Sequence, residues 1–261
     1  MTFKAYQLKL DWSQELPLYW FDNSPFKTHF MNSLSTRFFY GEKFFIDTMH
    51  KFKNEIVDEN LNESVVEFIK QEAIHRVIHK QFDDWLIFKG YDINELTHLS
   101  TKQIDNLQRK LSNQDMLMIT LCLEHLTTIF AEFFLKNPEL FDQMHPHFHK
   151  LWKWHAIEEV EHKAVAHELL MSVKNKFLPR RTYSIIVTSS IFTKILIGTL
   201  VLLKHDNQLW KWKTFKDAWS FLFGLKYGFI TKNIFPYLRI MRFDFSPHNI
   251  DHTALLAGYQ K

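Results

Sequence analysis

Long stretches rich in apolar residues alternate along the chain with short polar or proline-containing segments. This pattern, with few residues that break helices, predicts an all-α fold of long helices. Four stretches predict the helices of a bundle, and two further apolar stretches follow in the last third of the chain. The predicted helices cover residues 29–53, 63–88, 114–136, 146–174, 182–204 and 214–242.

Capping and breaking residues support several of these boundaries. Asn60 and Asn62 are alternative N-caps for the second helix. Pro146 suits the first turn of the fourth helix, and Pro236 predicts a kink or a break in the last one. The polar stretch 90–113 is too long for a tight hairpin, so it predicts a crossover between two helix pairs.

The order of the segments predicts three parts. Residues 1–27 form an aromatic, proline-containing lead-in. Residues 28–176 form a four-helix bundle that carries the chemistry. Residues 177–261 form an apolar helical extension that packs either on the bundle or on a membrane surface.

The composition agrees with a single large helical protein. Of 261 residues, 46% are hydrophobic, and there are only 6 Gly and 7 Pro. Such a chain can bury a core, which excludes intrinsic disorder, and it lacks the turn residues of a many-stranded sheet. A scattered net charge of +3 predicts no nucleic-acid partner. The single cysteine, Cys122, excludes a disulfide framework and a cysteine-ligated metal site.

The location of the protein depends on two segments. The N-terminal residues have no apolar segment behind a basic start, so we expect a cytoplasmic protein without an export signal. Residues 183–203 are apolar with Lys194 as their only charge. At about 1.5 Å per residue, they could just span a bilayer core of about 30 Å. Their hydroxyl side chains and basic flanks favour a buried or membrane-surface helix, and a membrane span is the alternative.

Glutamate and histidine occur at helical spacings on all four predicted bundle helices. The second and fourth helices each carry a Glu-x-x-His pair on one face, and His155 shares the face of the second pair. The first and third helices each carry one glutamate among apolar neighbours, where an unpaired carboxylate would be costly. Together they match the ligands of a dinuclear carboxylate site. These candidate ligands are Glu42, Glu72, His75, Glu124, Glu159 and His162.

The predicted helix lengths bring these groups to one level. Glu42 lies about 12 residues before the first predicted turn and Glu72 about 11 residues after it. Glu124 and Glu159 stand 14 and 13 residues from the prolines on either side of the next turn. Antiparallel helix pairs therefore place all four glutamates side by side. Oxygen and imidazole ligands of this kind suit two divalent or trivalent ions, with iron favoured and manganese an alternative.

Other acidic and imidazole groups leave alternatives open. His79 is either a further ligand or a group that supports a ligand. Glu158 is an alternative to its neighbour Glu159 as a ligand. His145, His147 and His149 alternate around the start of the fourth helix and cannot share one face, so no metal site is predicted there.

Four segments resemble a bacterial family labelled "predicted metal-dependent hydrolases", whose motif layout is similar to that of ferritin-like di-iron proteins. The segments are SLSTRFFYGEKFFI, FIKQEAIHRVIHKQFD, LEHLT and LWKWHAIEEVEHKAVAHELL. The resemblance covers residues 15–250 and implies a ferritin-like bundle with the six ligands named above. The spacing of His155, Glu159 and His162 also resembles that of di-iron arylamine N-oxygenases, which implies His155 as a seventh ligand.

The chain departs from the family pattern at two places. The family typically has Phe-Pro-x-Gly-Glu, whereas this chain has Phe39-Tyr40-Gly41-Glu42, which keeps the glutamate and changes the backbone before it. An aromatic-Asp pair that follows the fourth motif in the family is replaced here by His167-Glu168. Any role of that aspartate is therefore not expected in this chain.

These features predict a dinuclear metal enzyme, most simply a di-iron enzyme that uses O2 to oxidise a small apolar organic substrate. The alternative is a metal-dependent hydrolase that activates water, as the family label suggests. A second alternative is a metal-binding or membrane-associated helical protein without catalysis. The substrate, the metal and the oligomeric state are left open by the sequence.

Overall fold

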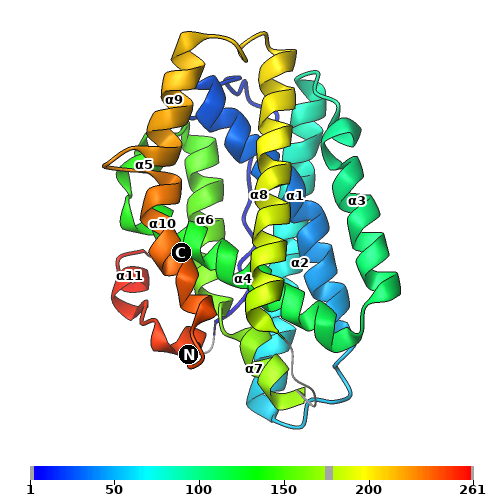
Figure 1. The fold of residues 1–261 in the computed structure, drawn as a ribbon. Coiled ribbons are helices and arrows are strands. Elements are labelled where there is room, and N and C mark those ends of the chain that lie inside the picture. The colour runs from blue at the N-terminus through cyan, green and yellow to red at the C-terminus, as the bar shows by residue number, and fades with distance from the viewer. Residues whose placement is uncertain (1–2, 174–178, 260–261) are drawn as a thin grey trace.

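The structure is a computed structural model that describes residues 3–173 and 179–259 (Figure 1). These residues form α-helices and two short 3₁₀-helices and contain no β-strand, which confirms the predicted all-α class. The helices are α1 (Pro25–His50), α2 (Glu59–Phe88), α3 (Ile93–Lys110), α4 (Asn113–Lys136), α5 (Glu139–Asp142), α6 (Pro146–His162), α7 (Val165–Val173), α8 (Arg180–His205), α9 (Trp212–Phe223), α10 (Phe229–Leu238) and α11 (Thr253–Ala257). The 3₁₀-helices are η1 (Arg239–Met241) and η2 (Pro247–Asn249).

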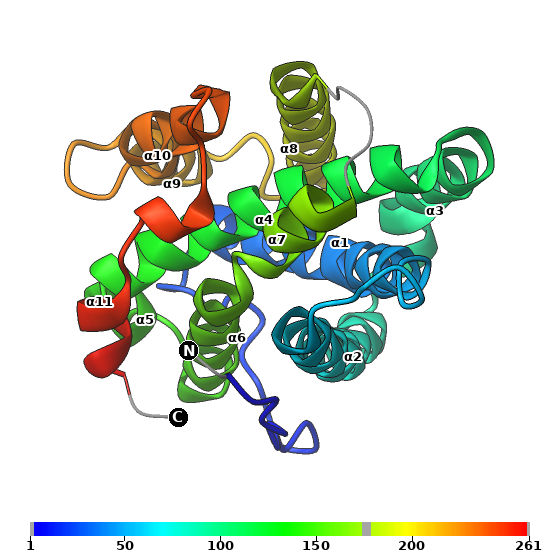
Figure 2. The same cartoon turned by 90° about the horizontal axis from the view of Figure 1, so that it is seen from below.

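The four predicted bundle helices, α1, α2, α4 and α6, pack around a core that divides into two clusters of buried apolar side chains along the bundle. α1 packs along α2, α4 packs along α6, and α1 and α2 also contact α4 and α6 respectively. Viewed from below, α2 and α6 appear end-on, whereas α4 crosses the view and is therefore inclined to both (Figure 2). The middle of α4 therefore meets the other three helices while its ends reach α3 and α5.

Local signals explain where the bundle helices begin. The Ser24 side chain accepts a hydrogen bond from the Lys27 amide and Pro25 opens α1, four residues earlier than the sequence predicts. Asp58 caps α2 in place of the predicted Asn60 or Asn62, because its carboxylate accepts the Leu61 amide. Pro146 occupies the first turn of α6, as predicted.

The predicted crossover 90–113 joins the two helix pairs, but it contains a helix that the sequence reading missed. Asp92 caps α3 through the amides of Asn94 and Glu95, and α3 packs mainly against α1. Its polar composition hid an amphipathic pattern, since Leu96 is buried on the inner side while polar residues face outward.

Two predicted helices are broken in the structure. The helix expected over 146–174 ends at His162 and resumes as α7 at Val165, so that α7 turns towards α4 and α2. Lys163, at the break, donates hydrogen bonds to the Ile250 carbonyl and to His252 of the C-terminal segment. The end predicted at residue 174, and the boundary between 176 and 177, lie outside the described residues.

The apolar C-terminal region forms a third layer rather than one more pair of bundle helices. The stretch predicted over 214–242 divides into α9, α10 and η1, with Pro236 inside α10 instead of at a break. α8 packs on α1 and α4, α9 on α1, and α10 on α4. All three lie on the side of α4 that faces away from α2 and α6 (Figure 2).

Gly41 and Gly198 show opposite surroundings. The space around Gly41 is open within 4 Å, so the mid-helix glycine of α1 marks no close helix contact. A Cβ at Gly198 would collide with the Ser33 side chain, because α8 lies directly on α1 there. The Ser33 hydroxyl also donates to the Ile195 carbonyl at 2.9 Å, which fixes α8 against the bundle.

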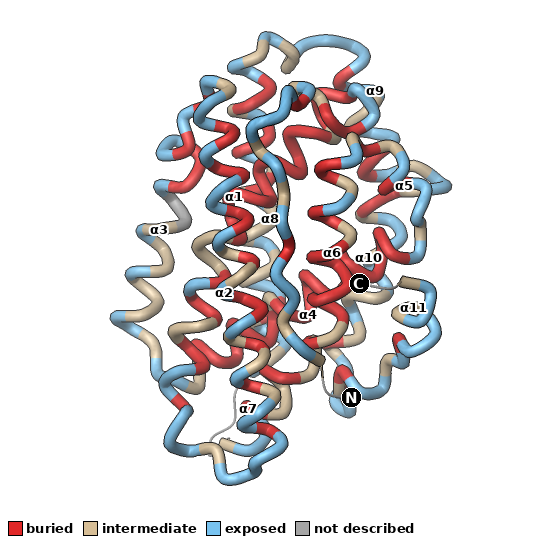
Figure 3. The backbone as a smooth tube through the Cα atoms, turned by 180° about the vertical axis from the view of Figure 1, so that it is seen from behind, coloured by how far each residue is buried: buried red, intermediate tan, exposed pale blue. Residues whose placement is uncertain are grey.

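Within residues 3–173 and 179–259, two helices, α4 and α8, are long and apolar enough to cross a membrane by length and composition alone. The most apolar window of α4 is 89% buried inside the protein, as expected of a core helix, whereas that of α8 is 22% buried. The buried backbone is concentrated in the central helices (Figure 3). The length and low burial of α8 are weak evidence for membrane association. The location of the protein stays a prediction.

Candidate metal centre

Eight carboxylate and imidazole side chains converge inside the bundle, where α1, α2, α4 and α6 approach one another. Each is at most 3% exposed. The residues on α2 are spaced at i, i+3 and i+7 and those on α6 at i, i+4 and i+7, so each helix presents its set on one face. The eight are Glu42 of α1, Glu72, His75 and His79 of α2, Glu124 of α4, and His155, Glu159 and His162 of α6.

These side chains form four overlapping groups that could each hold an ion. Within a group, each residue offers one ligand atom, and these atoms all lie within 4.8 Å of one another. The groups are Glu42–His79–His155, His75–His155–Glu159, Glu42–Glu72–His75 and Glu72–Glu124–His162. Because Glu72 belongs to groups at both ends of the cluster, the arrangement extends beyond what one ion would contact.

Glu159 connects the two ends of the cluster. Its Oε1 lies 3.4 Å from His155 Nε2 and 3.8 Å from His75 Nδ1. Its Oε2 lies 3.4 Å from Nε2 of His162, on the other side. A carboxylate whose two oxygens face two separate imidazole groups has the geometry of a bridging ligand between two ions.

The remaining carboxylates complete the two ends. Glu42 Oε1 lies 3.5 Å from His155 Nε2 and 3.6 Å from His79 Nε2. At the other end, His162 Nε2 lies 3.4 Å from Glu124 Oε2 and 3.5 Å from Glu72 Oε1. Two ligands about 2.1 Å from a common ion are separated by roughly 3.0 to 3.4 Å. The observed separations are close to that range and long for direct hydrogen bonds.

Most of these atoms have no hydrogen-bond partner. Both carboxylate oxygens of Glu42, Glu72 and Glu124 lack one, and so does Nε2 of His79 and of His155. Leaving a buried polar group unsatisfied costs about 1–3 kcal/mol, and more when the group is charged. Metal ions would satisfy all these atoms at once, so the residues present fit a metal centre.

Electrostatics also favours bound cations. Burial, reinforced by the neighbouring carboxylates, raises the pKa of Glu42 and Glu72 well above the ordinary value. Burial likewise raises the pKa of Glu124 to about 8, with the Glu159 charge adding to it against the pull of His162. Burial opposes ionisation of Glu159 and His162 too. The imidazole of His162 nevertheless lowers the pKa of Glu159 to about 2, and the carboxylates of Glu124 and Glu159 raise the pKa of His162 to about 9. A positive charge inside the cluster would relieve the repulsion among the carboxylates.

Two further groups orient the imidazoles. Glu158 Oε2 lies 3.2 Å from His75 Nε2, on the opposite side of the ring from the nitrogen that faces Glu159. The Tyr6 amide donates to the other oxygen of Glu158 at 3.3 Å. Such carboxylate–histidine pairs fix the tautomer of a metal ligand and raise its basicity. At the other end, the Ser35 hydroxyl lies 2.8 Å from Nδ1 of His79.

A comparison with models of protein families matches residues 4–251 to the family described as "Predicted metal-dependent hydrolase". This match extends over nearly the whole chain. The chain belongs to the predicted metal-dependent hydrolase family. Comparisons with curated proteins and with solved structures gave no match.

Membership in the predicted metal-dependent hydrolase family confirms the resemblance seen in the sequence motifs. It also agrees with the prediction of a metal-dependent enzyme, and the buried Glu and His groups could supply its metal site. The ferritin-like and di-iron parts of the resemblance are not addressed by the match and stay predictions.

The structure brings all seven predicted ligands of this family member into one cluster. His79, left open between two roles, lies in the cluster with Nε2 facing Glu42. Glu158, the alternative to Glu159, lies instead on the outer side of His75. The convergence follows from the helix register, whereas metal binding by these groups stays a prediction.

The histidines outside the predicted site lie elsewhere. His147 lies against Gln14 and the lead-in, and the His149 ring stacks on Phe141. Buried His125 points to a backbone carbonyl of α10 and not to the cluster. The histidine-rich start of α6 therefore contributes to packing.

Sequence reasoning missed the orienting groups. Ser35 lies seven residues before Glu42 on the same face of α1, so its spacing could have been noticed. The Tyr6 contact uses a backbone amide of the lead-in, and a backbone donor carries no signal of residue type. That contact depends on how the lead-in crosses α2 and α6.

One cavity adjoins the cluster, and a wider one is separated from it by a side chain. A cavity of about 20 Å³ touches His155 and Glu159 and is lined mainly by apolar side chains, including Phe38, Phe134 and Trp152. It has room for about one water-sized molecule.

The second cavity is wider, about 540 Å³, and opens beside α6 and the lead-in. Trp154 lines this cavity, and its ring meets His75 edge-on with the ring centroids 4.8 Å apart. Trp154 therefore stands between the wide cavity and the candidate metal ligands.

Proposed function

We propose that the protein is a hydrolase whose bundle holds two metal ions, with iron favoured and manganese an alternative. The observation that carries the proposal is Glu159, whose two oxygens face two separate sets of imidazoles. Glu72 supports it in the same way, because it belongs to groups at both ends of the cluster.

The proposed ligands follow from this geometry. Glu42 and Glu124 would each bind at one end, and Glu72 and Glu159 would bridge. His75, His155 and His162 would be the imidazole ligands, and His79 a further one at the Glu42 end. The unsatisfied atoms of these side chains support this assignment.

The residues around the proposed ligands orient one of them and exclude bulk water. Two bound ions would supply Lewis acidity and an activated water for attack on an ester, amide or phosphate. Glu158 holds His75 in one orientation, and the aromatic walls keep bulk water from the ligands. The 540 Å³ cavity is large enough to bind a small organic molecule, which Trp154 would separate from His75.

Oxidation of a small apolar organic substrate by O2 is a second candidate, and one observation favours it. The two Glu-x-x-His pairs and two single glutamates come from four helices, an arrangement used by di-iron and di-manganese carboxylate proteins. The same ions, if iron, would supply the redox chemistry. The apolar lining of the small cavity suits O2 better than it suits a charged group.

Elemental analysis of the full chain, expressed without a tag in iron-supplemented medium, tests the metal centre. About two metal ions per chain are expected, and fewer than about 0.2 would contradict the proposal. His162→Ala is expected to lose at least one ion, whereas His149→Ala, outside the cluster on the same helix, keeps both. Equal metal content in the two variants would show that His162 is not a ligand.

A second experiment separates the two reactions. Turnover of nitrophenyl esters or phosphates under nitrogen, with manganese or zinc in place of iron, supports hydrolysis. An absorbing ferric species that forms when O2 is admitted to the anaerobically reduced protein, with no such turnover, supports oxidation. Loss of either activity in His162→Ala but not in His50→Ala, which changes an exposed imidazole at the end of α1 that lines neither cavity, ties it to the cluster.

A further inference from the structure

The exposed apolar side chains of this protein are concentrated in its C-terminal layer. Of the 21 large apolar side chains that are exposed in the described ranges, 14 lie between residues 185 and 243. Eleven of these 14 form outward stripes on α8, α9 and α10, and the other three lie in the adjoining segments; together they are here called the C-terminal apolar face. Representative members are Ile185, Leu200, Trp212, Phe215, Trp219 and Phe235.

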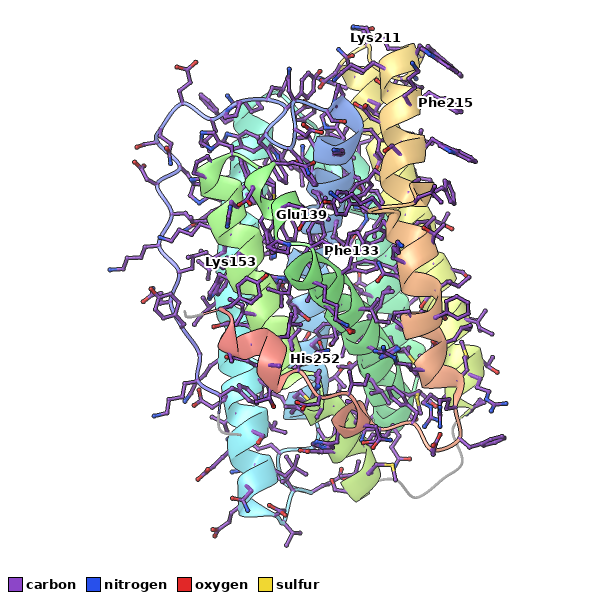
Figure 4. All side chains as sticks on the ribbon, turned by 90° about the vertical axis from the view of Figure 1, so that its left-hand side faces the viewer. Phe133, Glu139, Lys153, Lys211, Phe215 and His252 are labelled. Carbon is purple, nitrogen blue, oxygen red and sulfur yellow. The ribbon has the colours of Figure 1, made fainter. Side chains whose placement is uncertain are left out.

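Helix α9 shows why folding does not account for this exposure. On its inner side, buried Phe221 packs against Phe30 of α1, with the ring centroids 5.3 Å apart. On its outer side, Trp212, Phe215 and Trp219 are 67%, 58% and 61% exposed. Figure 4 shows Phe215 projecting away from the bundle. A helix that carries large apolar side chains on its outer side as well as on its inner side exposes an apolar patch, and such patches mark interaction sites.

Helix α8, like α9, has a buried inner side and exposed apolar side chains on its outer side. Buried Ile195 and Gly198 lie on α1, while Ile185, Ile197 and Leu200 are 44–55% exposed. The inner sides of α8, α9 and α10 all rest on α1 or α4. Their outer sides therefore face the same way, as the view in Figure 2 shows.

The charge of the same region indicates which kind of surface it binds. Residues 180–243 contain 11 Lys and Arg but only two acidic residues, Asp206 and Asp217, a net charge of +9. The whole chain carries +3, so the rest of the chain carries −6. Exposed Lys211 and Lys216 flank the aromatic stripe of α9, with Lys211 near Phe215 in Figure 4. Tryptophan together with lysine is the composition of a protein surface that binds a lipid headgroup region.

We propose that the C-terminal apolar face docks on a membrane surface that contains anionic lipids. The aromatic stripes would enter the headgroup boundary, and the surrounding lysines and arginines would pair with acidic headgroups. A second copy of this chain is disfavoured as the occupant, because two faces that are both formed by this positively charged segment would repel each other. The inference does not rest on the metal centre.

Because one side of α8 packs on the bundle, we expect α8 to lie on the membrane surface and not to cross it. One side of α8 is fixed on α1 by the Ser33–Ile195 hydrogen bond and the close approach at Gly198. Only the outer stripe, bounded by exposed Arg181 and Lys204, is available to lipid. A helix that lies in the membrane plane with such a stripe contributes affinity through the area it buries and through its flanking charges.

Co-sedimentation of the full chain with vesicles tests the proposal. Binding is expected to vesicles of phosphatidylcholine mixed with phosphatidylglycerol, with much weaker binding to phosphatidylcholine alone. The triple variant Lys211→Glu, Lys213→Glu, Lys216→Glu is expected to bind at least about 100-fold more weakly, since each cation contributes roughly fivefold. The variant Trp212→Ser, Phe215→Ser, Trp219→Ser is expected to abolish binding to both.

Matched variants exclude a general effect of surface charge or apolarity. Val77→Ser, Ile87→Ser, Phe88→Ser removes exposed apolar groups of α2, and Lys51→Glu, Lys53→Glu, Lys110→Glu reverses distant charges. Both are expected to bind like the unaltered chain, with circular dichroism confirming that every variant folds. Equal binding to the two vesicle types, or equal losses in the control variants, would overturn the proposal. So would a stable dimer in light scattering that fails to bind vesicles.

Discussion

The interior of the bundle and the C-terminal layer depart from ordinary protein anatomy in opposite directions. The interior buries four carboxylates and four imidazoles in the cluster, with most ligand atoms unsatisfied. The C-terminal layer exposes tryptophan and phenylalanine to solvent. Buried polar groups and exposed apolar patches are the two informative deviations in a folded chain. Each one indicates a partner outside the chain, and we propose metal ions for the first and lipid for the second.

Helices α4 and α8 make the same contrast at the level of single elements. Both are long and apolar, yet α4 is almost wholly enclosed while α8 shows one side to solvent. α4 also carries Glu124 into the core, whereas the mid-helix charge of α8, Lys194, is only partly buried and bonds to Gln103 and Ser190. Hydropathy alone therefore does not distinguish a core helix from a surface-docking helix. The packing around each helix does.

Metal removal should have the largest effect on the interior. Chelation of the metal-loaded protein is expected to lower Tm by about 10 °C, because a ligand at 1,000 times its Kd stabilises the folded state by about 4 kcal/mol. Differential scanning calorimetry before and after dialysis measures the change. An identical Tm in both samples would contradict the proposal that the interior binds metal ions. The decrease in Tm on chelation should be smaller in His162→Ala.

The metal-free protein should become less stable as pH rises. The pKa of Glu124 is raised to about 8 and that of His162 to about 9, so the folded state holds protons that the unfolded state has released. The resulting stability is present below the unfolded pKa and is lost as pH rises through the folded value. Below about pH 6.5, His79 and His155 oppose this trend, because burial lowers their pKa values. Urea unfolding should therefore show a decrease of a few kcal/mol between about pH 7 and pH 9. The metal-loaded protein should show the reverse trend, since its ligands must be deprotonated.

Glu158→Gln should have an intermediate effect. The amide keeps the size of the side chain but removes the charge that orients His75, so metal affinity is expected to fall about 10- to 100-fold. Competition with a fluorescent chelator measures the affinity. Glu161→Gln, on the same helix but outside the cluster, is the control. Equal affinities in the two variants would assign Glu158 no positioning role.

The smallest effect is expected on the outer side of α9. Phe215→Ser should change the free energy of unfolding by less than about 0.5 kcal/mol, because the ring is exposed. Phe221→Ala, on the inner side of the same helix, should cost about 3–5 kcal/mol. Urea unfolding of both variants compares the two sides directly. A large loss for Phe215→Ser would mean that its ring is needed for folding and not for a partner.

The bundle and its cluster were predictable because their signals are local and periodic. Glu72 and His75 share a face by spacing alone, and the distances of Glu42 and Glu124 from the turns set their level in the bundle. Orienting contacts such as the Tyr6 amide on Glu158 were not predictable, since they depend on the path of the lead-in. Metal binding itself is not decided by register, because the same carboxylates could be neutral.

The broken helices show the other limit of the sequence. No proline or glycine stands at the break after His162, where Lys163 instead reaches residues almost ninety positions later. The amphipathic helix α3 was hidden by its many polar residues, although Asp92 is an ordinary N-cap. Tertiary contacts decide such boundaries, and a helix pattern read along the chain does not contain them.

The position of Trp154 bears on the rate of whichever reaction the metal centre performs. Its buried indole lines the wide cavity and contacts the His75 ring. If a molecule held in that cavity approaches the ligands from this side, the ring has to move, and rings in a close-packed interior move less often than exposed ones. Turnover would then be limited by admission, and a smaller side chain at this position would return the slow step to the chemistry itself.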